Sequence, residues 1–200
     1  MKRRALLAAP LAVAGCGLDT RPYAELRQWP LRVRRPQALP PRRDGPVLLV
    51  RGFVAGPGME ARGLQSVQAD GSIRTEFYEE WSAPPAEAMA EAVRSWLSES
   101  GLFSAVLAPG SRLAAGFVLE AELDALWTVP AERRARTALG VTLVAEDAAG
   151  TTLLLQRRME GTAELSGPAP GDAVNAMMVA TSLLCGEIER RVGNNFETAG

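Results

Sequence analysis

The stretch FVLEAELDALW, from Phe117 to Trp127, decides the fold. Apolar and acidic residues alternate along it. Successive side chains of a strand point to opposite faces, so this pattern predicts a half-buried β-strand with its apolar residues on one face. Two further strand-like stretches, residues 137–146 and 151–160, follow after short connections. Together the three stretches predict an antiparallel meander.

The chain before this meander predicts additional strands. Residues 47–54 form an apolar, β-branched run that is typical of a largely buried strand. Residues 64–69 and 73–79 flank an Asp-Gly pair at 70–71, which favours a hairpin because both turn residues tolerate a positive φ. Residues 102–107 predict one more short strand.

Two stretches carry apolar residues at helical spacing. The first covers residues 86–97, follows two prolines suited to a first helical turn, and ends at Gly101. The second begins near Asp172, a capping candidate, and its apolar stripe extends to Val192. Two amphipathic helices packed on one face of a mostly antiparallel sheet bury both stripes economically, so the predicted fold class is α+β.

The chain contains no histidine. Histidine is the usual general base and a common transition-metal ligand, so Ser-His-Asp and Cys-His catalysis and histidine-containing zinc sites are excluded. The sequence also lacks a phosphate-binding P-loop, a dinucleotide-binding glycine motif and a nucleophile elbow. We therefore expect no enzymatic activity, no metal and no cofactor.

Three carboxylates lie on the polar face of the 117–127 strand: Glu120, Glu122 and Asp124. Carboxylates at such spacing can perform glycoside chemistry or bind calcium. The favoured interpretation is a solvent-exposed face whose acidic groups pair across strands with arginines from residues 133–136 and 157–158.

Large apolar side chains on the two helices raise a second possibility. Met89 and Trp96 on the first helix, with Met177 and Met178 on the second, could line an adaptable apolar groove for a phospholipid. A helix-to-sheet core is the favoured alternative. Cys185 is interpreted in the same way, as a small buried hydrophobe.

Trp81, at the end of the 73–79 strand, has two interpretations. It is either a surface aromatic or, as favoured here, a residue of the core.

The N-terminus begins with three basic residues and continues with ten apolar residues, 5–14, before Gly15 and Cys16. A run of ten is too short to cross a bilayer, which needs about 20 residues, but suits a secretory signal. The sequence Val-Ala-Gly-Cys at 13–16 resembles a bacterial lipobox. That resemblance implies a signal peptide at 1–15, cleavage before Cys16, diacylglycerol on the sulfur of Cys16 and an acyl chain such as palmitate on its new amino group. Such a chain would be held at a membrane without spanning it.

Residues 16–45 are predicted to be the lipidated N-terminus and a flexible tether, followed by a domain at 46–196. Prolines are frequent in the tether, and residues 17–44 contain seven arginines against three acidic residues. The remainder of the chain is acidic, which leaves no basic face for nucleic acid.

Two stretches then carry a family resemblance. They are EFYEEWSAPP at residues 76–85 and LSESGLFSAV at residues 97–106, which follow a lipobox and a proline-rich spacer. With the acidic alternating strand and the C-terminal helix, the chain resembles the ABC-type transport auxiliary lipoprotein family.

The resemblance implies a non-enzymatic periplasmic subunit of an intermembrane lipid transport system. Its partners would be an MCE-domain protein with an ABC permease and ATPase. Only Cys16, the lipidation site, is carried over. Gly17 in place of a retention aspartate favours the outer membrane over the inner. The alternative function is a periplasmic lipid-binding carrier or envelope-maintenance lipoprotein with an apolar groove.

Overall fold

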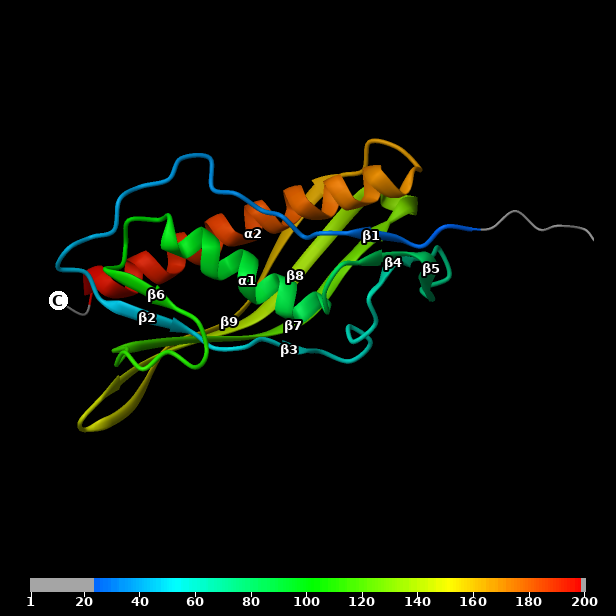
Figure 1. The fold of residues 1–200 in the computed structure, drawn as a ribbon. Helices are drawn as coiled ribbons and strands as arrows, with labels where there is room; N and C mark the ends of the chain where they lie inside the picture. The colour runs from blue at the N-terminus through cyan, green and yellow to red at the C-terminus, as the bar shows by residue number, and fades with distance from the viewer. Residues whose placement is uncertain (1–23, 199–200) are drawn as a thin grey trace, which may run out of the picture.

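The computed structural model describes residues 24–198, which form an α+β fold with two helices lying along one face of a large sheet (Figure 1). The strands, in chain order, are β1 (Arg27–Trp29), β2 (Val47–Val50), β3 (Val54–Ala55), β4 (Gly63–Val67), β5 (Ile73–Trp81), β6 (Ala105–Leu107), β7 (Phe117–Val129), β8 (Arg134–Asp147) and β9 (Gly150–Glu164). The helices are α1 (Pro85–Ser98), the short 3-10 turn η1 (Pro130–Glu132) and α2 (Pro170–Thr198).

The predicted meander is the centre of the sheet. β7 pairs antiparallel with β8 along its whole length, and β8 pairs antiparallel with β9. The opposite edge of β7 is occupied in turn by three short strands, β2, β3 and β4, which all run parallel to it. The alternating stretch that decides the fold is therefore the strand to which both halves of the sheet attach.

The sheet is mixed: its long pairings are antiparallel, as expected, whereas several short parallel pairings were not predicted. Among residues 24–198, five of the eight strand pairings are parallel and three are antiparallel. Short connections in the sequence reveal only the hairpin pairings, and these are confirmed: β4–β5 and β7–β8–β9. Parallel pairs require crossover connections, such as the one through α1 that brings β6 beside β2.

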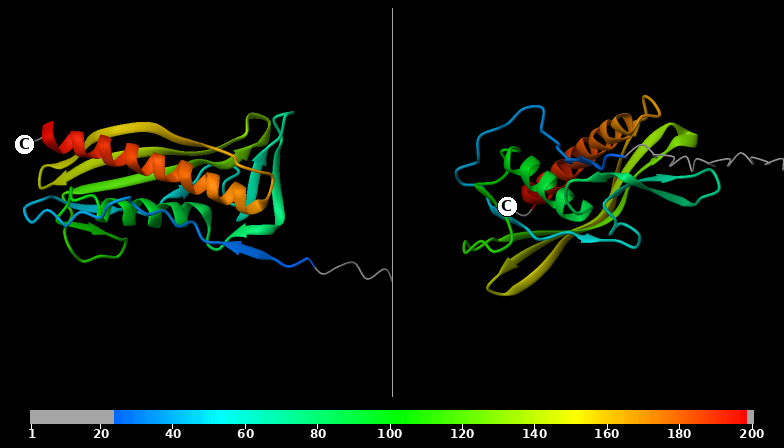
Figure 2. Two further views of the ribbon diagram at one scale, coloured as in Figure 1. Left: turned by 90° about the horizontal axis from the view of Figure 1, so that it is seen from above. Right: turned by 45° about the vertical axis from the view of Figure 1, so that its right-hand side comes forward.

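Both helices cover the same face, as predicted (Figure 2). The apolar stripe of α2 is buried against β8 and β9, and Met177, Leu184 and Ile188 are fully buried. α1 begins at Pro85, and its buried side chains include Met89, Val93 and Leu97. α2 begins two residues before Asp172, whose carboxylate reaches back to accept the Ala169 N–H at 3.1 Å.

No helix between residues 24 and 198 is both long enough and apolar enough to cross a membrane.

Candidate functional site

Cys16, the predicted lipidation site, and the predicted signal peptide at 1–15 lie outside the described residues. The description begins at Ala24, eight positions after Cys16 in the sequence. An extended chain spans at most about 3.5 Å per residue, so eight residues reach no further than about 28 Å. A lipid on Cys16 would therefore hold Ala24 within that distance of the membrane.

The four side chains considered for an apolar groove belong to the hydrophobic core. Met89 and Met177 are fully buried, Trp96 is 6% exposed, and Met178 packs against the same core. None of the four lines a cavity described within residues 24–198. The four side chains therefore lie in the core between the helices and the sheet, the alternative that the sequence favoured.

The three carboxylates of β7 lie on the sheet face away from the helices, and two of them, Glu120 and Asp124, pair with arginines of other segments. Asp124 accepts a hydrogen bond from Arg158 Nε at 2.8 Å, and Glu120 pairs with Arg51. Asp124 lies where the register between β7 and β8 shifts, so the alternation changes phase and Leu126 rather than Trp127 turns fully into the core. Within residues 24–198, no group of acidic or cysteine side chains is arranged to hold a metal ion.

Trp81 and Cys185 are core residues, as favoured from the sequence. Trp81 is 1% exposed, and Cys185 is a free, buried thiol. Burial raises the pKa of the Cys185 thiol to about 12, so it remains protonated at neutral pH. Neither side chain is available for surface chemistry.

Residues 24–46, expected to be part of a flexible tether, instead lie along the domain; we call this segment the N-terminal strap. Its first attachment is β1, which pairs in parallel with the end of β5. Glu79, 8% exposed, accepts hydrogen bonds at 2.7 Å from Arg27 Nε and from the Trp29 indole N–H. The Trp29 carbonyl also accepts the Ser82 N–H at 2.8 Å.

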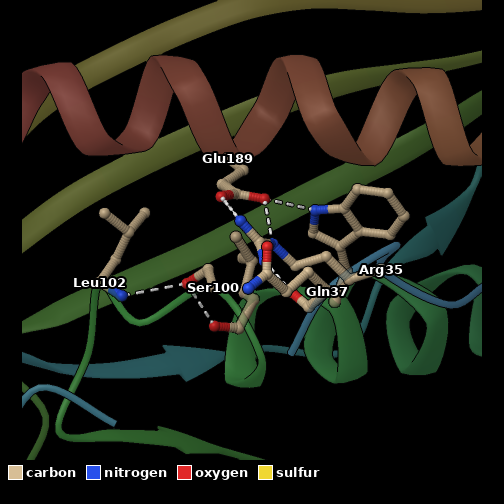
Figure 3. Close-up of polar contacts among 7 residues, drawn as sticks. Arg35, Gln37, Ser100, Leu102 and Glu189 are labelled. Atoms are coloured by element: carbon tan, nitrogen blue, oxygen red, sulfur yellow. Dashed lines mark hydrogen bonds and ion pairs between the residues drawn. The ribbon is translucent and has the colours of Figure 1, made fainter. Parts of the chain in front are cut away.

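The second attachment of the strap is on the helices (Figure 3). Glu189 of α2 accepts two hydrogen bonds from Arg35, each 3.0 Å, and one at 2.7 Å from the indole N–H of Trp96 on α1. The hydrogen bonds to Glu189 raise the pKa of Arg35 above its ordinary value. One carboxylate thus joins the strap to both helices with a bidentate pair, the stronger form of ion pair.

Backbone hydrogen bonds continue the second attachment beyond the end of α1. The Leu39 N–H donates to the Glu99 carbonyl at 2.8 Å, and the Arg42 N–H donates to the Phe103 carbonyl at 2.9 Å. Gly101 has a φ of 72°, and a Cβ there would meet Leu39 Cβ at 3.0 Å. Glycine is therefore required both for the turn and for the close approach of the strap.

The strap is held by residues at both ends of α1. Residues 76–85 contain Glu79 and Ser82, which receive β1, and residues 97–106 contain the backbone groups that receive Leu39 and Arg42. The two stretches lie at the two ends of α1. Their shared property in this structure is that they hold the N-terminal segment to the domain.

An exposed apolar surface lies beside the first attachment of the strap; we call it the aromatic patch, formed by Leu26, Phe77 and Tyr78. Their exposed fractions are 47%, 81% and 48%. The rings of Phe77 and Tyr78 meet edge to face, with centroids 4.9 Å apart. These three side chains line one shallow depression together with Ala24, where the described chain begins.

Sequence reasoning missed both the strap and the aromatic patch. A faint signal for the strap is the alternation of larger side chains at Arg27, Trp29, Leu31 and Val33 within a proline-rich segment. The signal for the patch is a pair of adjacent aromatics, Phe77 and Tyr78, inside an acidic run. Both signals are weak because neither segment buries a full face of its own element.

No protein-family profile matches the chain, and no curated protein matches it. Several solved structures share its fold. A protein of family DUF330 from Xanthomonas campestris is 14% identical, with 84% of this chain and 97% of that chain covered and a TM-score of 0.71. A hypothetical protein from Chlamydia trachomatis is 12% identical over 76% of this chain and 98% of that chain, with a TM-score of 0.54. At these identities the similarity is one of fold.

Proposed function

We propose that this chain is a lipid-anchored, non-enzymatic subunit of an envelope lipid transport system, and that it holds a docking domain at a fixed position next to a membrane. Its partners are an MCE-domain protein and the associated ABC permease and ATPase. The membrane is the outer membrane, with the domain in the periplasm. The observation that carries the proposal is the strap, which ties the segment following Cys16 to the domain.

A strapped N-terminus supports a positioning role. Had residues 16–45 been a free tether, the domain would sample a wide range of heights and orientations. Because the strap is bound at β5 and again at Glu189, only the seven residues between Cys16 and Ala24 would separate the lipid from the folded body. A short connection restricts the domain to a thin layer next to the membrane, which raises its effective concentration there.

The identity of the partners is supported by the resemblance of residues 76–85 and 97–106 to the auxiliary lipoprotein family. In this chain those residues make the contacts that hold the strap to the domain. The stretches that carry the resemblance are therefore the ones that would couple the anchor to the domain. Gly17 supports sorting to the outer membrane.

Co-purification from native membranes tests the proposal. The full chain, tagged after Gly200, is expected to be recovered with an MCE-domain protein, and the permease and ATPase are expected in the same fraction. A Cys16→Ser variant is the matched control, because it keeps the domain and removes the anchor. Recovery of the lipidated chain without any MCE-domain protein would contradict the proposal.

A second experiment addresses the fixed position. Insertion of a flexible Gly/Ser segment after Tyr23 lengthens the connection but leaves the strap and its contacts in place. We expect a loss of the MCE-domain protein from the purified complex as the insertion grows. Unchanged recovery at every length would show that the position of the domain is not what the partner requires.

A further inference from the structure

The aromatic patch stands out among the surfaces of residues 24–198 because its exposure is produced by a specific backbone feature. Phe77, at 81%, has the largest exposed fraction of any large hydrophobic residue described. Exposed single hydrophobics are common on protein surfaces, whereas a contiguous set next to an anchoring segment calls for a partner.

A large bulge in β5 presents the two rings. Gly63 pairs with Glu80 and Gln65 pairs with Thr75, so one residue of β4 is opposed by residues 76–79 of β5. In a regular strand, neighbouring side chains point to opposite faces. The bulge instead brings the Phe77 and Tyr78 rings into contact with each other and into solvent.

Gly63 makes this bulge possible. A Cβ at position 63 would lie 2.3 Å from the Glu76 carbonyl oxygen, which is far inside any real contact distance. Only glycine allows the backbone of residue 76 to cross so closely over β4. The exposure of the aromatic pair is therefore encoded in the hairpin, because Gly63 permits the bulge that turns Phe77 and Tyr78 toward solvent.

The patch lies beside the start of the described chain. Leu26 and Ala24 belong to the strap and border the same depression as the two rings, so the patch lies where the chain leads toward Cys16. The described chain begins at the end of the molecule that carries the β4–β5 hairpin (Figure 1). With at most about 28 Å of extended chain between Cys16 and Ala24, a lipid on Cys16 would hold this end within that distance of the membrane surface, which is near enough for the patch to reach it.

The charges around the patch are compatible with a phospholipid surface. Glu76 pairs with Arg74 at 3.1 Å, Glu80 pairs with Arg62 at 2.8 Å, and Glu79 pairs with Arg27. Each carboxylate beside the rings is thus compensated by an arginine. Aromatic rings with a polar tip, such as tyrosine, favour the headgroup region of a bilayer, where one end is apolar and the other is wet.

We propose that Leu26, Phe77 and Tyr78 insert into the headgroup region of the membrane that carries this chain's own lipid anchor. The inference rests on the proposed lipidation of Cys16. Two attachments to one surface, the acyl chains and the patch, fix the orientation of the domain as well as its distance from the membrane.

A site-specific fluorescent label tests this insertion in the full lipidated chain. Phe77→Cys receives an environment-sensitive nitrobenzoxadiazole label, and the chain is reconstituted into phosphatidylethanolamine–phosphatidylglycerol vesicles. The buried, protonated Cys185 and the acylated Cys16 do not compete for the label. The matched control is Leu153→Cys, an exposed apolar residue at 56%, next to the β8–β9 turn at the far end of the sheet (Figure 1).

The expected result is a blue-shifted, several-fold brighter label at position 77, quenched by nitroxide lipids and protected from iodide. The label at position 153 is expected to remain aqueous. A chain that floats with the vesicles but keeps an iodide-accessible label at position 77 overturns the membrane contact and leaves the anchor intact. A chain that does not float overturns both proposals.

Protection of position 77 that appears only after addition of the MCE-domain protein overturns the membrane contact in favour of a protein partner. A second pair of variants separates the patch from the short connection. A label at Glu25→Cys is expected to be protected from iodide when the patch is intact. The double substitution Phe77→Ser and Tyr78→Ser is expected to make that label accessible to iodide quenching. Unchanged protection at position 25 would show that proximity to the anchor, and not the patch, places this end in the bilayer.

Discussion

Gly161→Ala tests the packing of α2 on β9. Gly161 lies in β9 directly beneath α2, and a Cβ at this position would be 2.0 Å from the Ala180 carbonyl oxygen and 2.9 Å from the Leu184 nitrogen. Real Cβ atoms essentially never approach another atom within 3.0 Å. Both neighbours are backbone atoms of a helix, so a rotamer change cannot relieve the clash and α2 must retreat by about 1 Å.

The cost follows from what surrounds this contact. Ala180, Thr181 and Leu184 are fully buried, so a retreat of α2 loosens the packing on both sides of Gly161. Overpacking a tight core costs about 1–3 kcal/mol. Alanine also restricts the conformations of the unfolded chain, which raises the free energy of unfolding by about 0.4–1 kcal/mol. We expect a net loss of about 1–2 kcal/mol, which at about 2–4 °C per kcal/mol for a domain of this size lowers Tm by about 2–8 °C.

Urea and thermal unfolding of residues 17–200, followed by circular dichroism, measure this change. The matched control is Gly140→Ala in β8, the strand next to β9, where a Cβ meets nothing nearer than Asp124 Oδ2 at 3.9 Å. That variant is expected to remain within about 0.5 kcal/mol of the parent chain or to gain slightly. Equal stability of Gly161→Ala and Gly140→Ala would refute the close packing of α2 on β9.

Three other predictions concern the strap, the buried thiol and the anchor. Glu189→Gln weakens the hydrogen bonds to Arg35 and Trp96 and should lower the free energy of unfolding by about 1–2 kcal/mol, because these groups are only partly buried. Amide hydrogen exchange in the strap should become faster. Glu187→Gln is the control, because its ion pairs stay within α2, and it should leave the strap protected from exchange. Burial raises the pKa of Cys185 to about 12, so the folded thiol stays protonated while the unfolded thiol ionises near pH 9, and stability falls as the pH rises from about 9 toward 12. A disulfide reagent should therefore fail to modify Cys185 at pH 8 until urea unfolds the chain, and rapid modification of the native chain would contradict its burial. Cys16→Ser should abolish metabolic labelling with a radioactive fatty acid, and label retained on the serine variant would refute the lipidation site.

The regular elements could be predicted because each has a periodic pattern of its own. The alternation along 117–127, the Asp-Gly turn at 70–71 and the helical stripe that includes Met177 and Leu184 are local signals, and each corresponds to an observed element. The sheet connectivity could not be predicted in the same way. Which strand lies beside β7 depends on the crossovers through α1 and the loops, and these leave no periodic mark in the sequence.

The candidate site was predicted least well. Residues 24–46 were predicted to be a tether because they are rich in proline and arginine and show no periodic pattern of apolar residues. The segment is ordered by groups distant in the sequence: Glu79 is about fifty positions from Arg27, and Glu189 is 154 positions from Arg35. Local sequence patterns do not predict contacts between residues so far apart in the chain.

The sequence by itself determined the α+β fold class, the hairpins and the two amphipathic helices, because each depends on residues that lie close together in the chain. The tertiary structure alone decided that residues 24–46 form a strap, and that Phe77 and Tyr78 are exposed beside its start. Those outcomes depend on two carboxylates, Glu79 and Glu189, each of which accepts hydrogen bonds from an arginine and an indole, and on a glycine that lets one strand bulge over another. Such arrangements exist only after distant parts of the chain have come together.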